Sequence, residues 1–270
     1  MSSGRGIDHI GIASRNLDGL AAQYEALGFT CTPRAYHQDH MGTSNRLVQF
    51  KGRNFIELLE VDRPQTMLPH SPGFMGFGQF THDFLKRREG LSLIVLKTDD
   101  TAADLAAWKA KGLDVYDQFN FERFATLPDG SQATVRFELG FVTHPEIDVL
   151  FYVCDNKAEE HFWKPEFQAH ANGAEELEAI VLASSEPARH GEFLSALFDG
   201  DVAEVDGGVS VSFAEHRIDV VSPDALTDQG WVNHPPYACQ AKGVRIRARG
   251  MAGQMTGSGE AGGAFIEWTG

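Results

Sequence analysis

The chain has 270 residues, 42% hydrophobic and 23% charged, which is typical of a soluble globular protein with one large domain or two of ordinary size. Its formal net charge of −15 argues against a nucleic-acid partner, since phosphates call for clustered Lys and Arg, but tolerates a cationic ligand. The three cysteines show no CxxC spacing and are expected to be reduced thiols. Without a signal-peptide pattern or an apolar run long enough for a bilayer, a cytoplasmic location is expected.

The first predicted unit consists of a strand, a helix and three more strands. The strand covers about residues 7–13, Asn16 is placed to cap the helix that follows, and Gly28 ends that helix. Apolar residues recur at helical spacing between the two. The remaining strands are expected at about 29–34, 44–50 and 54–61.

The same order of elements is repeated along the chain. It begins at Ile7, restarts at Leu91 and restarts again at Leu177, so the starts are 84 and 86 residues apart. A spacing this regular predicts duplicated modules. From Ala238 onward the sequence looks like a degenerate fourth copy, in which residues 264–268 repeat the pattern of the first unit's last strand.

One connection, from Asp62 to Gly90, is too long and too apolar to be a simple linker. It combines prolines and glycines with several phenylalanines. Phenylalanines on a solvent-exposed loop would be unusual, so the segment is predicted to form a packed lid or a subunit contact, as in a homodimer. The phenylalanines are Phe74, Phe77, Phe80 and Phe84.

Two predicted strands of the first unit each place one strong metal-binding side chain among apolar neighbours. His9 follows Asp8 on the first strand, and Glu57 lies between Phe55 and Leu59 on the last. If these strands lie side by side, His9 and Glu57 project from the same concave face and form half of a divalent-metal site. The alternative is a half-buried histidine bonded to backbone, but a carboxylate among apolar residues favours the metal site.

These motifs, in this order, resemble the vicinal oxygen chelate superfamily, and within it the glyoxalase-like bacterial subfamily. The resemblance covers roughly residues 7–225. The segments that carry it are Asp8-His9-Ile10, Leu27-Gly28-Phe29-Thr30, His40-Met41-Gly42-Thr43-Ser44-Asn45, Ile56-Glu57-Leu58-Leu59 and the segment from Trp163 to Ala174.

The resemblance implies an α+β fold built from about three and a half βαβββ modules. In such proteins two modules pair into a curved mixed sheet that encloses one metal, with the helices on the outside. Residues 1–156 would then contain modules 1 and 2 and the active-site cup. Residues 157–270 would contain the third module and the degenerate fourth.

The resemblance also implies that His9 and Glu57 are metal ligands. In register with them, the second module offers Ser92 and Phe151, which are poor ligands. The best candidate for a third ligand is His170, in the motif-rich segment between the second and third modules. Its alternative is a loop histidine held by neighbouring residues.

Further polar residues are candidates for substrate binding. His40, Thr43 and Asn45 lie near the Gly42 turn, where a substrate would enter, as does His37. Turn chemistry or surface histidines explain them about as well. Ser92 is a candidate hydrogen-bond donor opposite His9, or simply a buried strand serine.

The expected function is therefore a metal-dependent enzyme of the lyase or isomerase type, acting on a small substrate with two adjacent oxygens. A divalent ion (Zn, Ni, Mn, Fe or Mg) polarises the substrate carbonyl, and Glu57 is the catalytic carboxylate. With Fe(II), two histidines and one carboxylate would equally support a ring-cleavage-type dioxygenase. A metal-free protein that sequesters an aromatic or cationic small molecule is the alternative from a different class.

Overall fold

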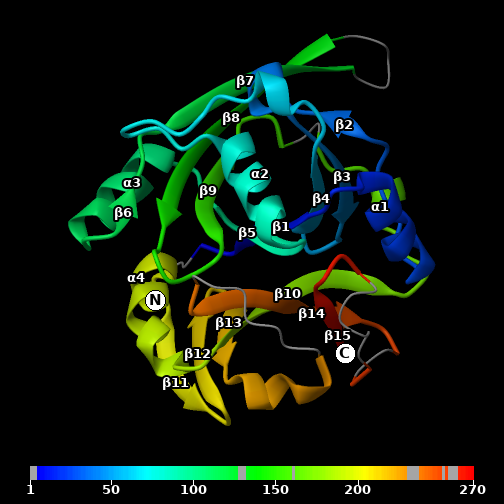
Figure 1. The fold of residues 1–270 in the computed structure, drawn as a ribbon. Coiled ribbons are helices and arrows are strands. Elements are labelled where there is room, and N and C mark those ends of the chain that lie inside the picture. The colour runs from blue at the N-terminus through cyan, green and yellow to red at the C-terminus, as the bar shows by residue number, and fades with distance from the viewer. Residues whose placement is uncertain (1–4, 127–131, 160–161, 230–236, 251–252, 255–260) are drawn as a thin grey trace.

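The computed structural model describes residues 5–126, 132–159, 162–229, 237–250, 253–254 and 261–270. These residues form a nine-stranded and a six-stranded mixed sheet with a few helices, which confirms the predicted α+β class. Figure 1 shows the nine-stranded sheet in the upper half and the six-stranded sheet in the lower half. None of the helices in the described ranges is long and apolar enough to cross a membrane.

The first two modules build the nine-stranded sheet. In the first module the elements are β1 (Ile7–Ala13), α1 (Leu17–Ala26), β2 (Ala35–Tyr36), η1 (Asp39–Met41), β3 (Thr43–Gln49) and β4 (Phe55–Val61), followed by η2 (Pro64–Thr66) and α2 (Phe77–Arg87). In the second they are β5 (Gly90–Lys97), α3 (Thr101–Ala110), β6 (Asp114–Val115), β7 (Phe119–Thr126), β8 (Gln132–Thr143), β9 (Leu150–Asn156) and η4 (Pro165–Phe167).

The rest of the chain builds the six-stranded sheet. The third module contains β10 (Ala174–Ser184), η5 (Pro187–His190), α4 (Gly191–Phe198), β11 (Asp201–Val205), β12 (Gly208–Phe213), β13 (His216–Val221) and η6 (Pro223–Gln229). The shortened fourth copy contributes β14 (Cys239–Ala248) and β15 (Phe265–Thr269).

One pairing rule relates all four copies. The first strand of each copy pairs in parallel with its last strand, as β1 with β4, β5 with β9, β10 with β13 and β14 with β15. The first strands of neighbouring copies then pair antiparallel, β1 with β5 and β10 with β14. Each sheet is therefore two modules joined through their first strands.

The helix α1 begins where the sequence predicts, and α3 begins with a cap of the same kind. The side chain of Asn16 accepts a hydrogen bond from the Gly19 N–H, and that of Asp100 accepts one from the Ala103 N–H. The predicted strand at 29–34 does not form, and the chain there runs as loop until β2.

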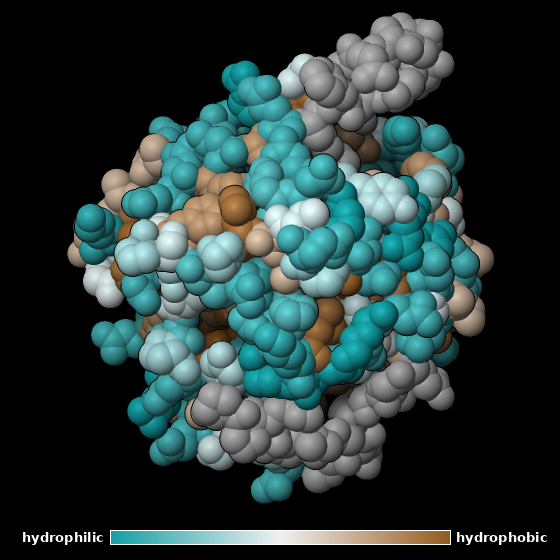
Figure 2. All heavy atoms as spheres, turned by 45° about the horizontal axis from the view of Figure 1, so that its top comes forward, coloured by the Kyte–Doolittle hydropathy of each residue, from teal (hydrophilic) through white to brown (hydrophobic). Residues whose placement is uncertain are grey.

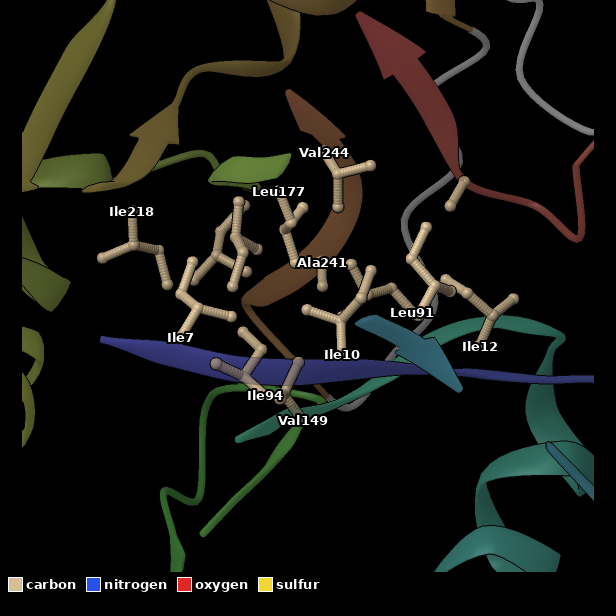
Figure 3. Close-up of a cluster of buried hydrophobic side chains, with 14 of the residues drawn as sticks. Ile7, Ile10, Ile12, Leu91, Ile94, Val149, Leu177, Ile218, Ala241 and Val244 are labelled. Carbon is tan, nitrogen blue, oxygen red and sulfur yellow. The ribbon is translucent and has the colours of Figure 1, made fainter. Parts of the chain in front are cut away.

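The main core lies between the two sheets. Figure 3 shows isoleucines of β1 and β5, such as Ile10 and Ile94, facing Leu177, Ala241 and Val244 of the other sheet. These side chains are fully or almost fully buried and belong to one continuous cluster. Since side chains alternate along a strand, the opposite face of β1 and β5 is left free to line a cavity.

The Asp62–Gly90 connection forms a lid, as its composition predicts. Its second half is the helix α2, which in Figure 1 lies across the nine-stranded sheet between β9 and β4. Phe77 and Phe84 are buried, while Phe74 and Phe80 are half-buried. Phe77 lines the cavity beneath the helix. Elsewhere the surface is mostly hydrophilic on the face that Figure 2 shows, with hydrophobic residues in small areas.

Candidate functional site

A cavity of about 180 Å³ lies on the concave face of the nine-stranded sheet. Side chains of β1, β3 and β4 form one wall, strands of the second module form the other, and α2 contributes Phe77. Residues of the first wall are His9, Asn45, Leu47, Phe55 and Glu57, with His37 beside them; the second wall includes Phe121, Phe137, Leu139, Tyr152 and Cys154.

His9 and Glu57 face each other because of strand parity. The parallel pairing of β1 and β4 sets Gly11 opposite Glu57 and His9 opposite Phe55, so all four project from one face. The His9 Nε2 lies 3.9 Å from Glu57 Oε2, and both side chains are buried. The prediction that these two side chains approach each other is confirmed; their role as metal ligands remains a prediction.

Both ring nitrogens of His9 have partners. Nδ1 lies 2.5 Å from Asp8 Oδ1, and Nε2 lies 2.9 Å from the Tyr152 hydroxyl. A carboxylate can only accept, so Nδ1 carries the proton and Nε2 presents its lone pair toward the cavity. The ring also stacks on Phe55, with 4.3 Å between centroids. The orientation of His9 is therefore fixed from two sides.

Glu57 is ionised although it is buried. Burial favours the neutral acid, but the neighbouring His37 and His9 imidazoles and the hydrogen bond of Asn45 outweigh it, so the pKa of Glu57 is held below its usual value. Asn45 Nδ2 donates to Glu57 Oε1 at 2.6 Å, and His37 Nε2 lies 3.4 Å from the same oxygen.

His37 belongs to the site more closely than the sequence indicates. Its Nδ1 lies 2.8 Å from the Thr43 hydroxyl, which turns Nε2 toward Glu57. Thr43 therefore positions His37 and is not a cavity residue, whereas Asn45 lines the cavity as expected. His40 does not line the cavity, and its ring lies 5.7 Å from that of Phe119, so its substrate contact remains a prediction. Because His37 and His40 both precede the Gly42 turn, the sequence does not show which of them faces the cavity.

His170 does not reach the cavity, and the prediction that it is the third ligand is wrong. Its Nδ1 accepts from the Thr30 N–H at 3.0 Å and its Nε2 donates to the Gln49 carbonyl at 2.8 Å. The ring packs edge-on against Phe29 and Phe50, and burial lowers the pKa of His170. The motif-rich segment thus closes the far side of the first module, where both histidine nitrogens satisfy backbone groups.

The second module's counterparts of His9 and Glu57 are also not those predicted. Ile10 pairs with Ile94 across β1 and β5, and this pair relates the two modules by an approximate twofold. Because Gly11 pairs with Leu93, Leu93 takes the place of His9. Tyr152, opposite Val95, takes the place of Glu57.

Ser92 and Phe151 are each one residue away from these places. The register between β1 and β5 shifts at Ser92, whose neighbours Leu91 and Leu93 pair with consecutive residues. The Ser92 hydroxyl is buried, donates to the Gly11 carbonyl at 3.4 Å and does not line the cavity, as in the alternative of a buried strand serine. Phe151 faces the main core, while Tyr152 faces the cavity.

The comparisons with known proteins agree with this topology. A family model described as a glyoxalase-like domain matches residues 7–198, well over half of the chain. The chain belongs to the glyoxalase-like domain family. The predicted vicinal oxygen chelate fold is thereby confirmed. No curated protein matches the sequence.

Solved structures show the same fold. A hypothetical protein from Staphylococcus aureus has 18% identity and a TM-score of 0.73, over 97% of this chain and 98% of its own. A mutant of 4-hydroxymandelate synthase from Streptomyces coelicolor has 12% identity and a TM-score of 0.55, over 91% and 71%. A fusion of a xylose isomerase-like TIM barrel with 4-hydroxyphenylpyruvate dioxygenase has 16% identity and a TM-score of 0.53, over 90% and 36%. At these identities the similarity concerns the fold alone.

The donor set of this glyoxalase-like site fits a divalent cation in its chemistry. Donors that share one first-row metal at about 2.0–2.3 Å each lie within roughly 4.5 Å of each other, and the 3.9 Å from His9 to Glu57 and 3.4 Å from His37 to Glu57 meet that limit. The hydrogen bond from His9 to Asp8 is the anchoring usual for a metal-ligating histidine. Within the described ranges, no three His, Cys, Asp or Glu side chains are yet grouped as a complete metal site. These residues would have to draw together around the ion.

The six-stranded sheet carries no second copy of this donor set in the described residues. There Asp219 is opposite Val181, as Glu57 is opposite Gly11, but its carboxylate is bound by Arg245, which also pairs with Glu267. An internal guanidinium thus satisfies the carboxylate. The candidate site is therefore in the first sheet.

Proposed function

We propose that this chain is a metal-dependent enzyme of the lyase or isomerase type that acts on a small substrate with two adjacent oxygens. The observation that carries the proposal is the ionised Glu57 carboxylate, buried in the cavity wall beside His9 and His37. Each imidazole is anchored at its far nitrogen, by Asp8 and by Thr43. Anchored imidazoles beside a buried negative charge are suited to binding a divalent cation.

Under this proposal His9 Nε2 and Glu57 hold the cation, with His37 within reach. A bound cation supplies a positive charge that polarises a substrate carbonyl and acidifies the neighbouring C–H. Glu57 then accepts the proton. Because its pKa is lowered, Glu57 is a weak base and removes a proton only from a C–H that is strongly acidified. Because Glu57 is a weak base, proton removal requires the cation to acidify the C–H.

The neighbouring side chains have supporting roles in this proposal. Asn45 donates to one Glu57 oxygen and holds the carboxylate plane. Asp8 keeps the proton of His9 on Nδ1. Phe77 and the apolar wall of the second module keep water away from the reacting atoms.

A second candidate is a ring-cleavage-type dioxygenase. The observation that favours it is the composition of the donor set, since His9, His37 and Glu57 are two histidines and one carboxylate, the set typical of non-haem Fe(II) oxygenases. Oxygen consumption by the Fe(II)-loaded protein with catechol would distinguish this candidate from the lyase or isomerase.

The test of the proposal is the metal content of protein purified without chelator. We expect about one divalent ion per chain, lost in the His9→Ala and Glu57→Gln variants. The matched control is His40→Ala, which removes a histidine of the same loop region that does not line the cavity. Metal-free wild-type protein that still binds a small molecule in the presence of chelator would instead support the sequestration protein.

A further inference from the structure

Residues 162–170, named the strap below, are held against the end of β3. The side chain of Gln49, the last residue of β3, donates to the Phe162 carbonyl at 2.9 Å and accepts from the Lys164 N–H at 3.2 Å. At the other end of the strap, His170 donates to the Gln49 carbonyl at 2.8 Å. The Gln49 side chain is buried, so one residue of β3 holds both ends of the strap from within the protein.

The strap brings two aromatic rings to the cavity. The hydrogen bonds of the Gln49 amide lie on either side of Trp163, whose indole N–H donates to Glu159 Oε1 at 2.8 Å. Phe162 and Trp163 both line the cavity. Their ring centroids lie 5.1 and 6.0 Å from the centroid of Phe55 on β4. The strap therefore packs both rings against one residue of the first module.

Gln49, Phe55 and His9 form one row across three neighbouring strands. The antiparallel register of β3 and β4 sets Gln49 opposite Phe55, and the parallel register of β4 and β1 sets Phe55 opposite His9. Residues opposite each other project from the same face of a sheet. The Phe55 and His9 rings stack with 4.3 Å between centroids and 16° between planes. One phenyl ring thus connects the strap to the imidazole.

This stacking restrains His9 in a direction that its hydrogen bonds do not. Asp8 and Tyr152 hold the two ring nitrogens, and hydrogen bonds to ring nitrogens act in the plane of the ring. Stacking acts perpendicular to that plane and opposes a tilt of the ring. Phe55 can supply this restraint because it is buried and close-packed against the two strap rings.

We propose that the strap is a positioning element of the site, which sets the tilt of the His9 imidazole through Phe55. Gln49 and His170 anchor the strap, and Trp163 packs against Phe55. A nitrogen that binds a metal must aim its lone pair at the ion, so the tilt governs affinity. The effect on metal binding rests on the proposed function, whereas the positioning of His9 does not.

Nuclear magnetic resonance of the histidine ring protons tests the positioning without metal. The ring current of Phe55 shifts the His9 signals upfield, and their loss in His9→Ala assigns them. We expect Trp163→Ala and Gln49→Leu to move these signals downfield, toward the position of an unstacked imidazole. Trp163→Phe keeps an aromatic ring beside Phe55 and is expected to leave the signals in place.

Metal affinity provides the second measurement. Competition for Zn²⁺ with a fluorescent chelator is expected to show about tenfold weaker binding in Trp163→Ala and Gln49→Leu, as when the outer support of a ligand is removed. The matched control is Asn172→Ala. Asn172 holds the same connection by donating to the Leu27 carbonyl at 2.9 Å, but it lies beyond the strap and does not line the cavity.

The outcomes separate this inference from the proposed function. Circular dichroism checks folding, and Trp163→Ala, at a half-buried position, carries the test if Gln49→Leu does not fold. Unchanged His9 signals in Trp163→Ala, or equal shifts in Asn172→Ala, would show that the strap only closes the first module. Shifted signals with unchanged Zn²⁺ affinity would overturn the inference as well. Shifted signals in a protein whose wild type binds no Zn²⁺ would keep the positioning and refute the proposed function.

Discussion

Glu57 keeps its negative charge in a position where burial alone would neutralise it. The charge persists because Asn45 donates to the carboxylate and the His37 and His9 imidazoles lie 3.4 and 3.9 Å from its oxygens, and within the described residues no lysine or arginine pairs with it. A buried charge held only by imidazoles and an amide is stabilised further by a cation. At the scale of the residue, this arrangement is the strongest reason to expect a metal.

Tyr152 provides a test at the same scale. Its hydroxyl lies 2.9 Å from His9 Nε2, the nitrogen that would bind the cation. Burial raises the pKa of Tyr152 well above its usual value, as do the charges of Glu57 and nearby groups, so the hydroxyl stays protonated and competes for that lone pair. We predict that Tyr152→Phe retains metal and binds it as tightly as wild type or several-fold more tightly, measured by competition with a fluorescent chelator. Loss of metal in this variant would show that Tyr152 is itself a ligand.

The elements that the sequence predicts best are those with local signals. Asn16 and Asp100 identify the starts of α1 and α3, because a capping side chain leaves a mark in the sequence itself. The helix α2 has no such mark, since its N-cap is Gly76 without a side-chain hydrogen bond and a second glycine, Gly78, lies in its first turn. A glycine-rich start looks like a loop.

The site is predicted only in part, for a related reason. His9 and Glu57 follow from alternation within single strands, which local sequence defines. The prediction that Ser92 is in register with His9 is wrong because a register shift between β1 and β5 inserts one residue. Only the strand pairing reveals this shift. The prediction that His170 is a metal ligand is wrong because the side of the module that a loop covers depends on tertiary packing, for which local sequence carries no signal.

The packing of α2 gives a prediction at the scale of the element. A Cβ at Gly78 would lie 1.8 Å from the Met41 carbonyl oxygen of η1, and backbone cannot give way as a side chain can. Gly78→Ala should therefore lift α2 from η1, lower the free energy of unfolding by about 1–3 kcal/mol and weaken ligand binding. Amide hydrogen exchange in α2 measures the change, with Gln79→Ala on the same helix as the control. Unchanged protection in Gly78→Ala would mean that α2 is not held by this contact.

At the scale of the whole molecule, the two sheets are joined by buried contacts. The Asn54 side chain, on the turn before β4, donates to the Leu177 carbonyl and accepts from the Leu177 N–H. One hydrophobic cluster runs through both sheets. The boundary near residue 156 separates two sheets that share a core, and we predict a single cooperative unfolding transition.

His216 makes this junction sensitive to acid. Burial first, and then the charge of Lys97, lower the pKa of His216 from 6.5 to about 4, while Glu215 and Glu178 oppose the shift. The Nδ1 of the ring accepts a hydrogen bond from the Ile7 N–H at 3.4 Å, and protonation of Nδ1 would replace that acceptor by a donor that faces a donor.

The sign of the pH dependence follows from that lowered pKa. Between about pH 6.5 and 4 the unfolded chain binds the proton and the folded chain does not, so the contribution of His216 is complete above pH 6.5 and is lost as the pH falls toward 4. We predict a loss of at most about 3 kcal/mol over this range, measured by urea unfolding. The decrease should be smaller in His216→Gln. An identical decrease in the variant would assign the acid sensitivity to other groups.

The central claim is that His9 and Glu57 share one divalent cation. Anomalous diffraction from crystals grown with Mn²⁺ tests it most directly. We predict one strong peak in the cavity, bonded to His9 Nε2 and a Glu57 oxygen, with no peak at His170. A cavity without a peak at millimolar Mn²⁺, or a peak bound to neither His9 nor Glu57, would contradict the claim.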